Sequence, residues 1–324
     1  MEASTSDTST ELDRRLHAIT RACEMAYEAT QSEAISSVRS GFKSLTHQLA
    51  RPVQIAFFGE TNVGKTTLAN RILGAQVLPT SVVANTPYSV HVRHGQMPSV
   101  IVHTADGKSQ RHAGGILPKS GTTPITKLEI VLPLPQLREI EVFDTPSADR
   151  QGPGAIPHSP RADIFVWCTN ASRAWSASDR AARLKLPPIG RERALLVATN
   201  ADTLGSEAAR EAVRQRLQRE ADALFGAICF SGMAADSKQP DDQREPPALK
   251  RSEDDLSFEK TVFRSIRAFR ERRQRTVRRL SDRLSRLAIA ALIAEHPGAK
   301  QDAGPVGQLI AEIEAFSPVG TNQQ

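Results

Sequence analysis

The stretch "VQIAFFGETNVGKTTLANRIL" at residues 53–73 decides the fold. Its first six residues, "VQIAFF", form an apolar run with Gln54 as its one polar member, which is typical of a strand buried on both faces. Residues 59–66, "GETNVGKT", then fit the pattern G-x-x-x-x-G-K-[ST], and a helical pattern follows. In such an arrangement the backbone N–H groups of the loop and the helix N-terminus surround the phosphates of a nucleotide. The alternative interpretation is an ordinary strand-to-helix turn with a surface lysine.

The residues of this phosphate loop divide into separate expected roles. Backbone N–H groups of the loop point at the β- and γ-phosphates, Lys65 bridges these two phosphates, and the Thr66 hydroxyl binds Mg²⁺. The loop predicts these nucleotide-binding residues: Gly59, Glu60, Thr61, Asn62, Val63, Gly64, Lys65, Thr66 and Thr67.

Further strand-like runs continue along the chain. "EIEVFD" (139–144), "ADIFVWCT" (162–169) and "ALLVATN" (194–200) are of buried-strand length. Helical patterns separate the later ones, as at residues 206–224. Alternating strands and helices predict an α/β fold with a doubly wound, mostly parallel sheet.

The end of the run at 194–200 carries a candidate for base recognition. The segment "TNAD" (199–202) resembles the [NT]-K-x-D pattern of G proteins, with Thr199 in the first position and Asn200 in place of lysine. We expect the Asp202 carboxylate to accept two hydrogen bonds from guanine, since adenine offers no such pair of donors. The alternative is an aspartate that caps a loop after a strand.

Another candidate follows the strand-like run at 139–144. In "FDTPS" we expect Asp144 to hold Mg²⁺ through a water, and the backbone N–H of Ser147 to contact the γ-phosphate. Glycine is usual at the latter position, and the Cβ of serine disfavours a positive φ there. The alternative is an ordinary aspartate at a strand-to-turn junction.

Together these segments resemble the dynamin-like GTPases, especially the short bacterial ones. The resemblance rests on "FFGETNVGKTTLANRILGAQVLPT", on the strand that leads to "DTPS", and on "ICFSGMAA", and it covers about residues 51–235. It implies that Ser231 and Gly232 belong to the last guanine loop. It also implies that Thr86 is the switch threonine that binds Mg²⁺, and that Asn62 helps a monovalent cation neutralise transition-state charge.

The resemblance implies a Mg²⁺-dependent GTPase that converts GTP to GDP and phosphate by in-line attack of water, with Lys65, Thr86 and Asn62 as the catalytic residues. No glutamine directly follows Ser147 to orient water, so we expect slow hydrolysis that dimerisation across the nucleotide face stimulates. Two alternatives remain open. One is a nucleotide-gated interaction module with little hydrolysis, and the other is a P-loop ATPase.

The sequence on both sides of this domain has patterns that predict helices. Apolar residues recur every three or four positions within 10–50 and again within 258–294. We therefore expect an N-terminal helical segment (1–50), the GTPase domain (51–235), a linker rich in proline and charge (236–257), and a basic amphipathic helix with a disordered tail (258–324). The flanking helices are expected to pack as a small bundle, as they do in the family.

Charge is concentrated in the second helical flank. Residues 260–286 hold eleven basic side chains against Glu271 and Asp282, whereas the whole chain of 324 residues has a net charge of +6. Three interpretations are open: a solvated face, attraction to an anionic membrane, and nucleic-acid binding, which the lack of interleaved aromatic residues disfavours. Three distant cysteines and a polar N-terminus predict a cytoplasmic protein, peripheral at the inner face of a membrane if the basic segment binds lipid.

Overall fold

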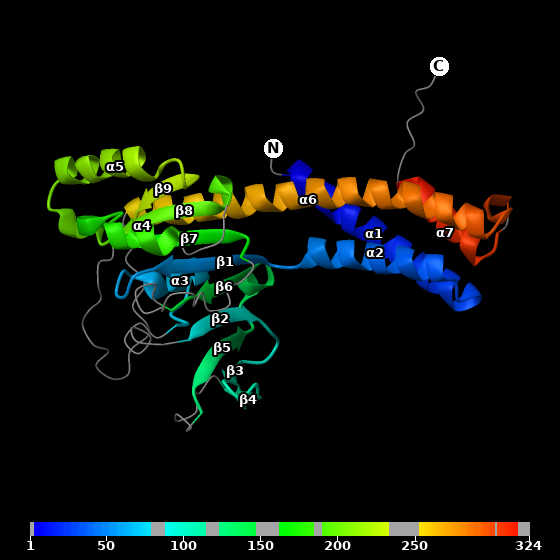
Figure 1. The fold of residues 1–324 in the computed structure, drawn as a ribbon, viewed down its shortest axis with the longest axis horizontal. Coiled ribbons are helices and arrows are strands. Elements are labelled where there is room, and N and C mark those ends of the chain that lie inside the picture. The colour runs from blue at the N-terminus through cyan, green and yellow to red at the C-terminus, as the bar shows by residue number, and fades with distance from the viewer. Residues whose placement is uncertain are drawn as a thin grey trace, which may run out of the picture. The chain divides into compact units, whose positions relative to one another are not determined.

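The computed structural model describes seven stretches of the chain, with side chains from Thr10 onward: residues 3–78, 88–114, 123–146, 162–184, 190–232, 253–301 and 303–316. They form two compact units. The sheet unit is Pro52–Phe269, and the helical unit combines Met1–Arg51 with Arg270–Gln324. Figure 1 labels their elements.

The sheet unit is built on nine strands in the order β4-β3-β5-β2-β6-β1-β7-β8-β9. Their bounds are β1 Val53–Gly59, β2 Ser89–His94, β3 Ser99–Thr104, β4 Ser109–Ala113, β5 Ile125–Leu132, β6 Ile140–Asp144, β7 Ile164–Asn170, β8 Ala194–Thr199 and β9 Ala227–Phe230. From β6 to β9 every neighbouring pair is parallel, while β2 pairs antiparallel with β6 and the β3–β4 hairpin extends the far edge. The predicted doubly wound, mostly parallel sheet is confirmed.

Helices cover the two faces of this sheet in separate layers. On one face, α3 (Lys65–Leu73) and the start of α6 (Glu253–Glu295) pack against inward residues of β1 such as Ile55 and Phe57. On the other, α4 (Ala177–Leu184) and α5 (Glu207–Ala221) pack against the alternate residues, such as Phe58. Each strand of the central sheet is therefore apolar on both sides, which explains the continuous apolar runs in the sequence.

The helical unit consists of α1 (Ala3–Thr30), α2 (Glu33–Ala50), the later part of α6 and α7 (Pro305–Phe316) (Figure 1). Ser32 separates α1 from α2 and caps α2, since its hydroxyl accepts a hydrogen bond from the Ile35 N–H at 3.2 Å. One core joins residues of all four helices, among them Leu16, Phe42, Leu292 and Ile313. The expectation that the flanking helices pack as a small bundle is confirmed.

Two features of the C-terminal flank differ from the prediction. The expected linker (236–257) is too long at its C-terminal end, because α6 already begins at Glu253, where three acidic residues favour a helix N-terminus. Most of that linker lies outside the described residues. The helix α7 was not predicted, although Pro305 suits its first position. The described helices include none that is long and apolar enough to cross a membrane.

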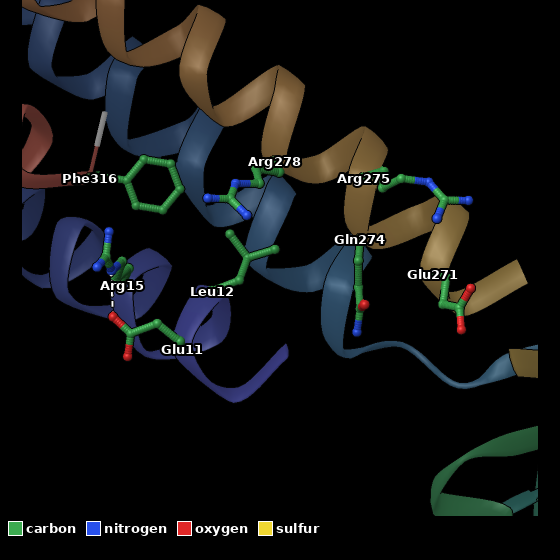
Figure 2. A pocket seen from close by; sticks show the side chains of 8 residues that line it. All are labelled: Glu11, Leu12, Arg15, Glu271, Gln274, Arg275, Arg278 and Phe316. Atoms are coloured by element: carbon green, nitrogen blue, oxygen red, sulfur yellow. Dashed lines mark hydrogen bonds and ion pairs between the residues drawn. The ribbon is translucent and has the colours of Figure 1, made fainter. Parts of the chain in front are cut away.

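The helical unit also contains a pocket of about 360 Å³ between α1, α6 and the end of α7 (Figure 2). Leu12 and Phe316 supply its apolar side chains, and Arg15, which forms an ion pair with Glu11, supplies part of its charge. The remaining lining residues are Glu271, Gln274, Arg275 and Arg278 of α6. None of the described residues that are predicted to bind nucleotide lines this pocket.

Candidate nucleotide site

The predicted motifs meet at the carboxyl edge of the sheet. Strand β1 ends at Gly59, β6 at Asp144, β8 at Thr199 and β9 at Phe230. Their register places Phe57 opposite Asp144 and Gly59 opposite Cys168. Parallel strands of an open α/β sheet bind ligands beyond their carboxyl ends, so this edge is the expected place for a ligand.

The phosphate loop has backbone conformations that its sequence explains. Gly59 has φ 141°, and a Cβ at this position would lie 2.2 Å from the carbonyl oxygen of Cys168. Asn62 and Gly64 have φ of 58° and 83°, values that asparagine and glycine adopt most readily. Gly64 is also the N-cap of α3, so the loop leads directly into the helix N-terminus.

Lys65 lies inside the loop and is buried. Its Nζ donates hydrogen bonds to the carbonyl oxygens of Gly59 at 3.2 Å and Glu60 at 2.6 Å. The ammonium group is thus held by the loop that would surround the phosphates. The rest of the predicted loop set follows the chain: Glu60, Thr61, Asn62, Val63 and Gly64 lie between β1 and α3, and Thr66 and Thr67 lie in the first turn of α3.

Thr66 and Asp144, the two described metal-ligand candidates, are in direct contact. The Thr66 hydroxyl donates to Asp144 Oδ2 at 2.6 Å, although 78 residues separate them. Asp144 is only 3% exposed, and within the described chain its Oδ1 has no hydrogen-bond partner. Burial raises the pKa of Asp144, against the hydrogen bond from Thr66 and the charge of Lys65. A hydroxyl beside an unsatisfied carboxylate oxygen is a donor set that fits Mg²⁺.

The base-recognition segment is tied to the phosphate loop by Thr199. Its buried hydroxyl lies 2.7 Å from the carbonyl oxygen of Val63 and 3.0 Å from that of Thr169. Asn200 has φ 55°, and it leads into the short 3₁₀ helix Ala201–Leu204, which carries the exposed Asp202. Thr199 therefore fixes the start of this segment, and Asp202 is exposed at the surface.

Ser231 and Gly232 follow β9 and are both buried. The Ser231 hydroxyl donates to Asp255 Oδ1 of α6 at 2.7 Å, so this side chain points into the protein. The Ser231 backbone pairs with the base segment, since its N–H donates to Ala198 at 3.0 Å and its carbonyl accepts from Ala201 at 3.1 Å. The structure thus brings "TNAD" and the Ser231-Gly232 loop together.

Two predicted residues, Thr86 and Ser147, lie outside the described residues. Conversely, sequence reasoning assigned no role to Asn70 and Thr145. The buried Asn70 side chain holds residues 77 and 78, where its Oδ1 accepts from the Leu78 N–H at 2.7 Å. The Thr145 hydroxyl donates to the Phe57 carbonyl at 2.6 Å and so fixes the end of β6 beside β1. The available signal for Asn70 was its place in "TTLANRIL", within the segment that carries the family resemblance.

A comparison with known protein families identifies the family of this chain. A model described as "Dynamin family" matches residues 55–221, just over half of the chain. The chain belongs to the dynamin family. The match includes the phosphate loop, Asp144 and "TNAD", and it stops before Ser231.

The chain is also similar to individual curated proteins and solved structures. The chain is similar to the isoniazid-induced protein IniC of two Mycobacterium tuberculosis strains, with 27% identity over 150 residues, or 44% of this chain and 26% of that protein. It thus spans only about a quarter of these curated relatives. Two structures of "an oligomerised bacterial dynamin pair" have the same fold at 17% identity, with TM-scores of 0.58 and 0.52. They cover 90% and 83% of this chain, which in turn covers 56% and 43% of theirs.

Proposed function

We propose that this dynamin-family protein binds GTP with Mg²⁺ and hydrolyses it to GDP and phosphate. The observation that carries the proposal is the Thr66–Asp144 pair at 2.6 Å, which joins the last residue of the phosphate-loop motif to a buried carboxylate at the end of β6 whose Oδ1 has no hydrogen-bond partner within the described residues. A strand-to-helix turn without a ligand has no need of a buried carboxylate at this point. The family membership and the carboxyl-edge position support the same conclusion.

Each described residue then has a role that its position supports. Lys65 exchanges its loop carbonyl partners for β- and γ-phosphate oxygens. Thr66 and Asp144 would hold Mg²⁺, Asp144 through a water, and the bound ion would supply charge neutralisation at the phosphate oxygens. Asp202 accepts hydrogen bonds from guanine. Catalysis then consists of positioning water for in-line attack and of electrostatic stabilisation.

Three further assignments belong to the proposal. Thr86 binds the metal and positions the attacking water through its backbone. Asn62, at the exposed turn of the loop, helps to hold a monovalent cation that assists catalysis. The backbone N–H of Ser147 contacts the γ-phosphate.

The test is a matched pair of threonine variants. Thr66→Ala removes the candidate metal ligand, and Thr126→Ala removes an exposed hydroxyl that donates to the His103 carbonyl in the sheet at 3.2 Å. In the full chain, Mg²⁺-dependent GTP affinity and single-turnover phosphate release should fall in Thr66→Ala and stay unchanged in Thr126→Ala. Equal behaviour of the two variants would remove the metal site from the proposal.

The same assays separate the alternatives. GTP binding without phosphate release above background identifies a nucleotide-gated interaction module. Stronger binding of ATP than of GTP identifies an ATPase and removes Asp202 from its role.

We further propose that hydrolysis is faster in a dimer formed across the nucleotide face. The solved structures with the same fold are those of an oligomerised bacterial dynamin pair, described as providing a mechanism for the long-range sensing and tethering of membranes. No glutamine directly follows Ser147, and in this proposal the partner molecule of the dimer completes the positioning of water. Turnover per molecule should rise with protein concentration, and a flat dependence would refute the dimerisation.

A second candidate function is attraction to an anionic membrane. In this proposal the protein is cytoplasmic and peripheral at the inner face of the membrane. The helix α6 exposes arginines such as Arg279, Arg283 and Arg286 together with the apolar Leu280 and Leu287, which are 42% and 61% exposed. Exposed cations interleaved with apolar side chains favour an anionic lipid surface over plain solvent.

Sedimentation with phosphatidylserine vesicles tests the membrane proposal. Binding should weaken when salt rises and when Arg279 and Arg283 are changed to glutamate. Arg219→Glu on α5 is the matched control. Equal binding to neutral vesicles would contradict the proposal, and tighter binding to nucleic acid would favour the remaining interpretation of the basic helix.

A further inference from the structure

The first turn of α6 contains a buried carboxylate that the proposed mechanism does not use. Asp255 is 1% exposed and forms an ion pair with Arg71 of α3, which is 4% exposed. These residues are 184 positions apart in the chain. A buried charge pair needs further hydrogen bonds to offset the loss of hydration. The groups that form these hydrogen bonds therefore identify the part of the protein that the pair holds in place.

Those other groups belong to the loop after β9. The Ser231 hydroxyl donates to Asp255 Oδ1 at 2.7 Å. Arg71 Nη1 donates to Ser231 Oγ at 3.3 Å and to the Gly232 carbonyl at 3.4 Å. Ser231 in turn pairs through its backbone with Ala198 and Ala201 on either side of "TNAD". Only one residue, Ser231, thus separates Asp255 from the base-recognition segment in this chain of contacts.

A second ion pair connects the same helix turn to the same segment. Arg210 of α5 lies 3.0 Å from Asp254 Oδ2, and its Nε donates to the Ala201 carbonyl at 3.3 Å. Both members of this pair are partly exposed, at 30% and 21%. Two arginines from two helices thus link neighbouring aspartates of α6 to backbone within or beside residues 199–202 and 231–232.

The third acid of the turn behaves differently. The Glu253 side chain is exposed and has no ion pair or hydrogen bond within the described residues. All three acids favour the helix N-terminus, so helix capping alone does not distinguish them. Only Asp254 and Asp255 have partners that contact the base-recognition backbone.

We propose that Asp254 and Asp255 are positioning residues for guanine recognition, which act through Arg210, Arg71 and Ser231. This inference rests on the proposed binding of GTP. The aspartates touch no nucleotide in this proposal. They fix the backbone that places the Asp202 carboxylate against the ring N–H and the exocyclic amino group of guanine.

Inosine triphosphate tests this role, because it carries the same phosphates and ribose as GTP but lacks the exocyclic amino group. The affinities of the full chain for GTP and for inosine triphosphate are measured with Mg²⁺ for Asp254→Asn, Asp255→Asn and the control Glu253→Gln. The wild type should prefer GTP by about tenfold or more, the value of a hydrogen bond to a charged group. The preference should fall towards one in the two aspartate variants and stay unchanged in the control.

A merely structural ion pair would lower thermal stability and leave the ratio of the two affinities as it is. If Asp255→Asn does not fold, Asp254→Asn decides, because its pair with Arg210 is partly exposed. An unchanged ratio in the folded aspartate variants, or an equal loss in Glu253→Gln, overturns the inference. A wild type that binds GTP no better than ATP overturns the proposed function instead, and the inference falls with it.

Discussion

Replacing Gly59 with alanine should damage the phosphate loop far more than a glycine substitution in an open turn. Its φ of 141° is nearly exclusive to glycine, which adds about 2 kcal/mol of backbone strain for alanine. The new Cβ would also lie 2.2 Å from the Cys168 carbonyl oxygen. An ordinary contact needs about 1 Å more, so β1 and β7 must separate at this pair.

The separation removes up to two ladder hydrogen bonds at about 1 kcal/mol each, and the total comes to about 4 kcal/mol. Gly107→Ala is the matched control, because Gly107 has φ 79° with no atom near its Cβ position. In Gly107→Ala the only destabilising contribution is the left-handed backbone conformation, which costs about 1 kcal/mol. For a unit of this size we expect melting temperatures to fall by about 8–16 °C and about 2–4 °C, respectively.

Tryptophan fluorescence is the appropriate assay, because both tryptophans of the chain, Trp167 and Trp175, belong to the sheet unit. Gly59→Ala should also weaken GTP binding, since the Gly59 carbonyl holds Lys65. Equal losses of stability in the two variants would refute the reasoning, because the contact with Cys168 would then contribute nothing.

Three further predictions concern single side chains. Lys65→Ala should weaken GTP binding in a titration by about 10–100-fold or more, the value of one to two charged hydrogen bonds, and unchanged affinity would sink the site assignment. Ser147→Gly should raise the single-turnover rate of GTP hydrolysis by about fivefold if serine strains the loop by about 1 kcal/mol; no change would mean that the loop already accommodates serine. Partial burial raises the pKa of Glu129, but hydrogen bonds from Lys127 and Arg93 outweigh it and lower the pKa to about 2. A carboxyl whose folded pKa is lowered stabilises the protein above its unfolded pKa of 4.5, so Glu129→Gln should lose about 2–3 kcal/mol in urea unfolding at pH 7. This difference from the wild type should shrink as the pH falls from 4.5 towards 2, and a difference independent of pH would contradict the assignment.

The sheet and the phosphate loop could be predicted because their physics is local. Residues 53–73 contain a strand, a loop and a helix start in one continuous stretch, and each part requires residue types that the sequence shows directly. Asp144 and Thr199 could be placed because each ends an apolar run, and the ends of parallel strands share one edge. The match of Thr66 to Asp144 follows from that shared edge.

The parts that escaped prediction depend on contacts between distant residues. Neither Arg71 nor Asp255 belongs to a local pattern that indicates burial, and charged residues are usually exposed. Their pairing requires α3 and α6 to cover the same face of the sheet, which no periodicity reveals. The first turn of α6 was assigned to the linker because its acidic residues continue the charge-rich composition of the preceding sequence.

Ser231 has two separate roles, one for its backbone and one for its side chain. The family pattern predicted Ser231 at the nucleotide, and its backbone does pair with the base-recognition segment. Its hydroxyl, however, is fully buried against Asp255. A motif in a loop mainly specifies backbone geometry, because backbone N–H groups bind the ligand whatever the side chain. The side chain can then anchor the loop to the rest of the protein. The residue type at this position therefore depends on the side chains that support the loop. Selectivity for guanine should accordingly depend on α6 as well as on the residues that touch the base.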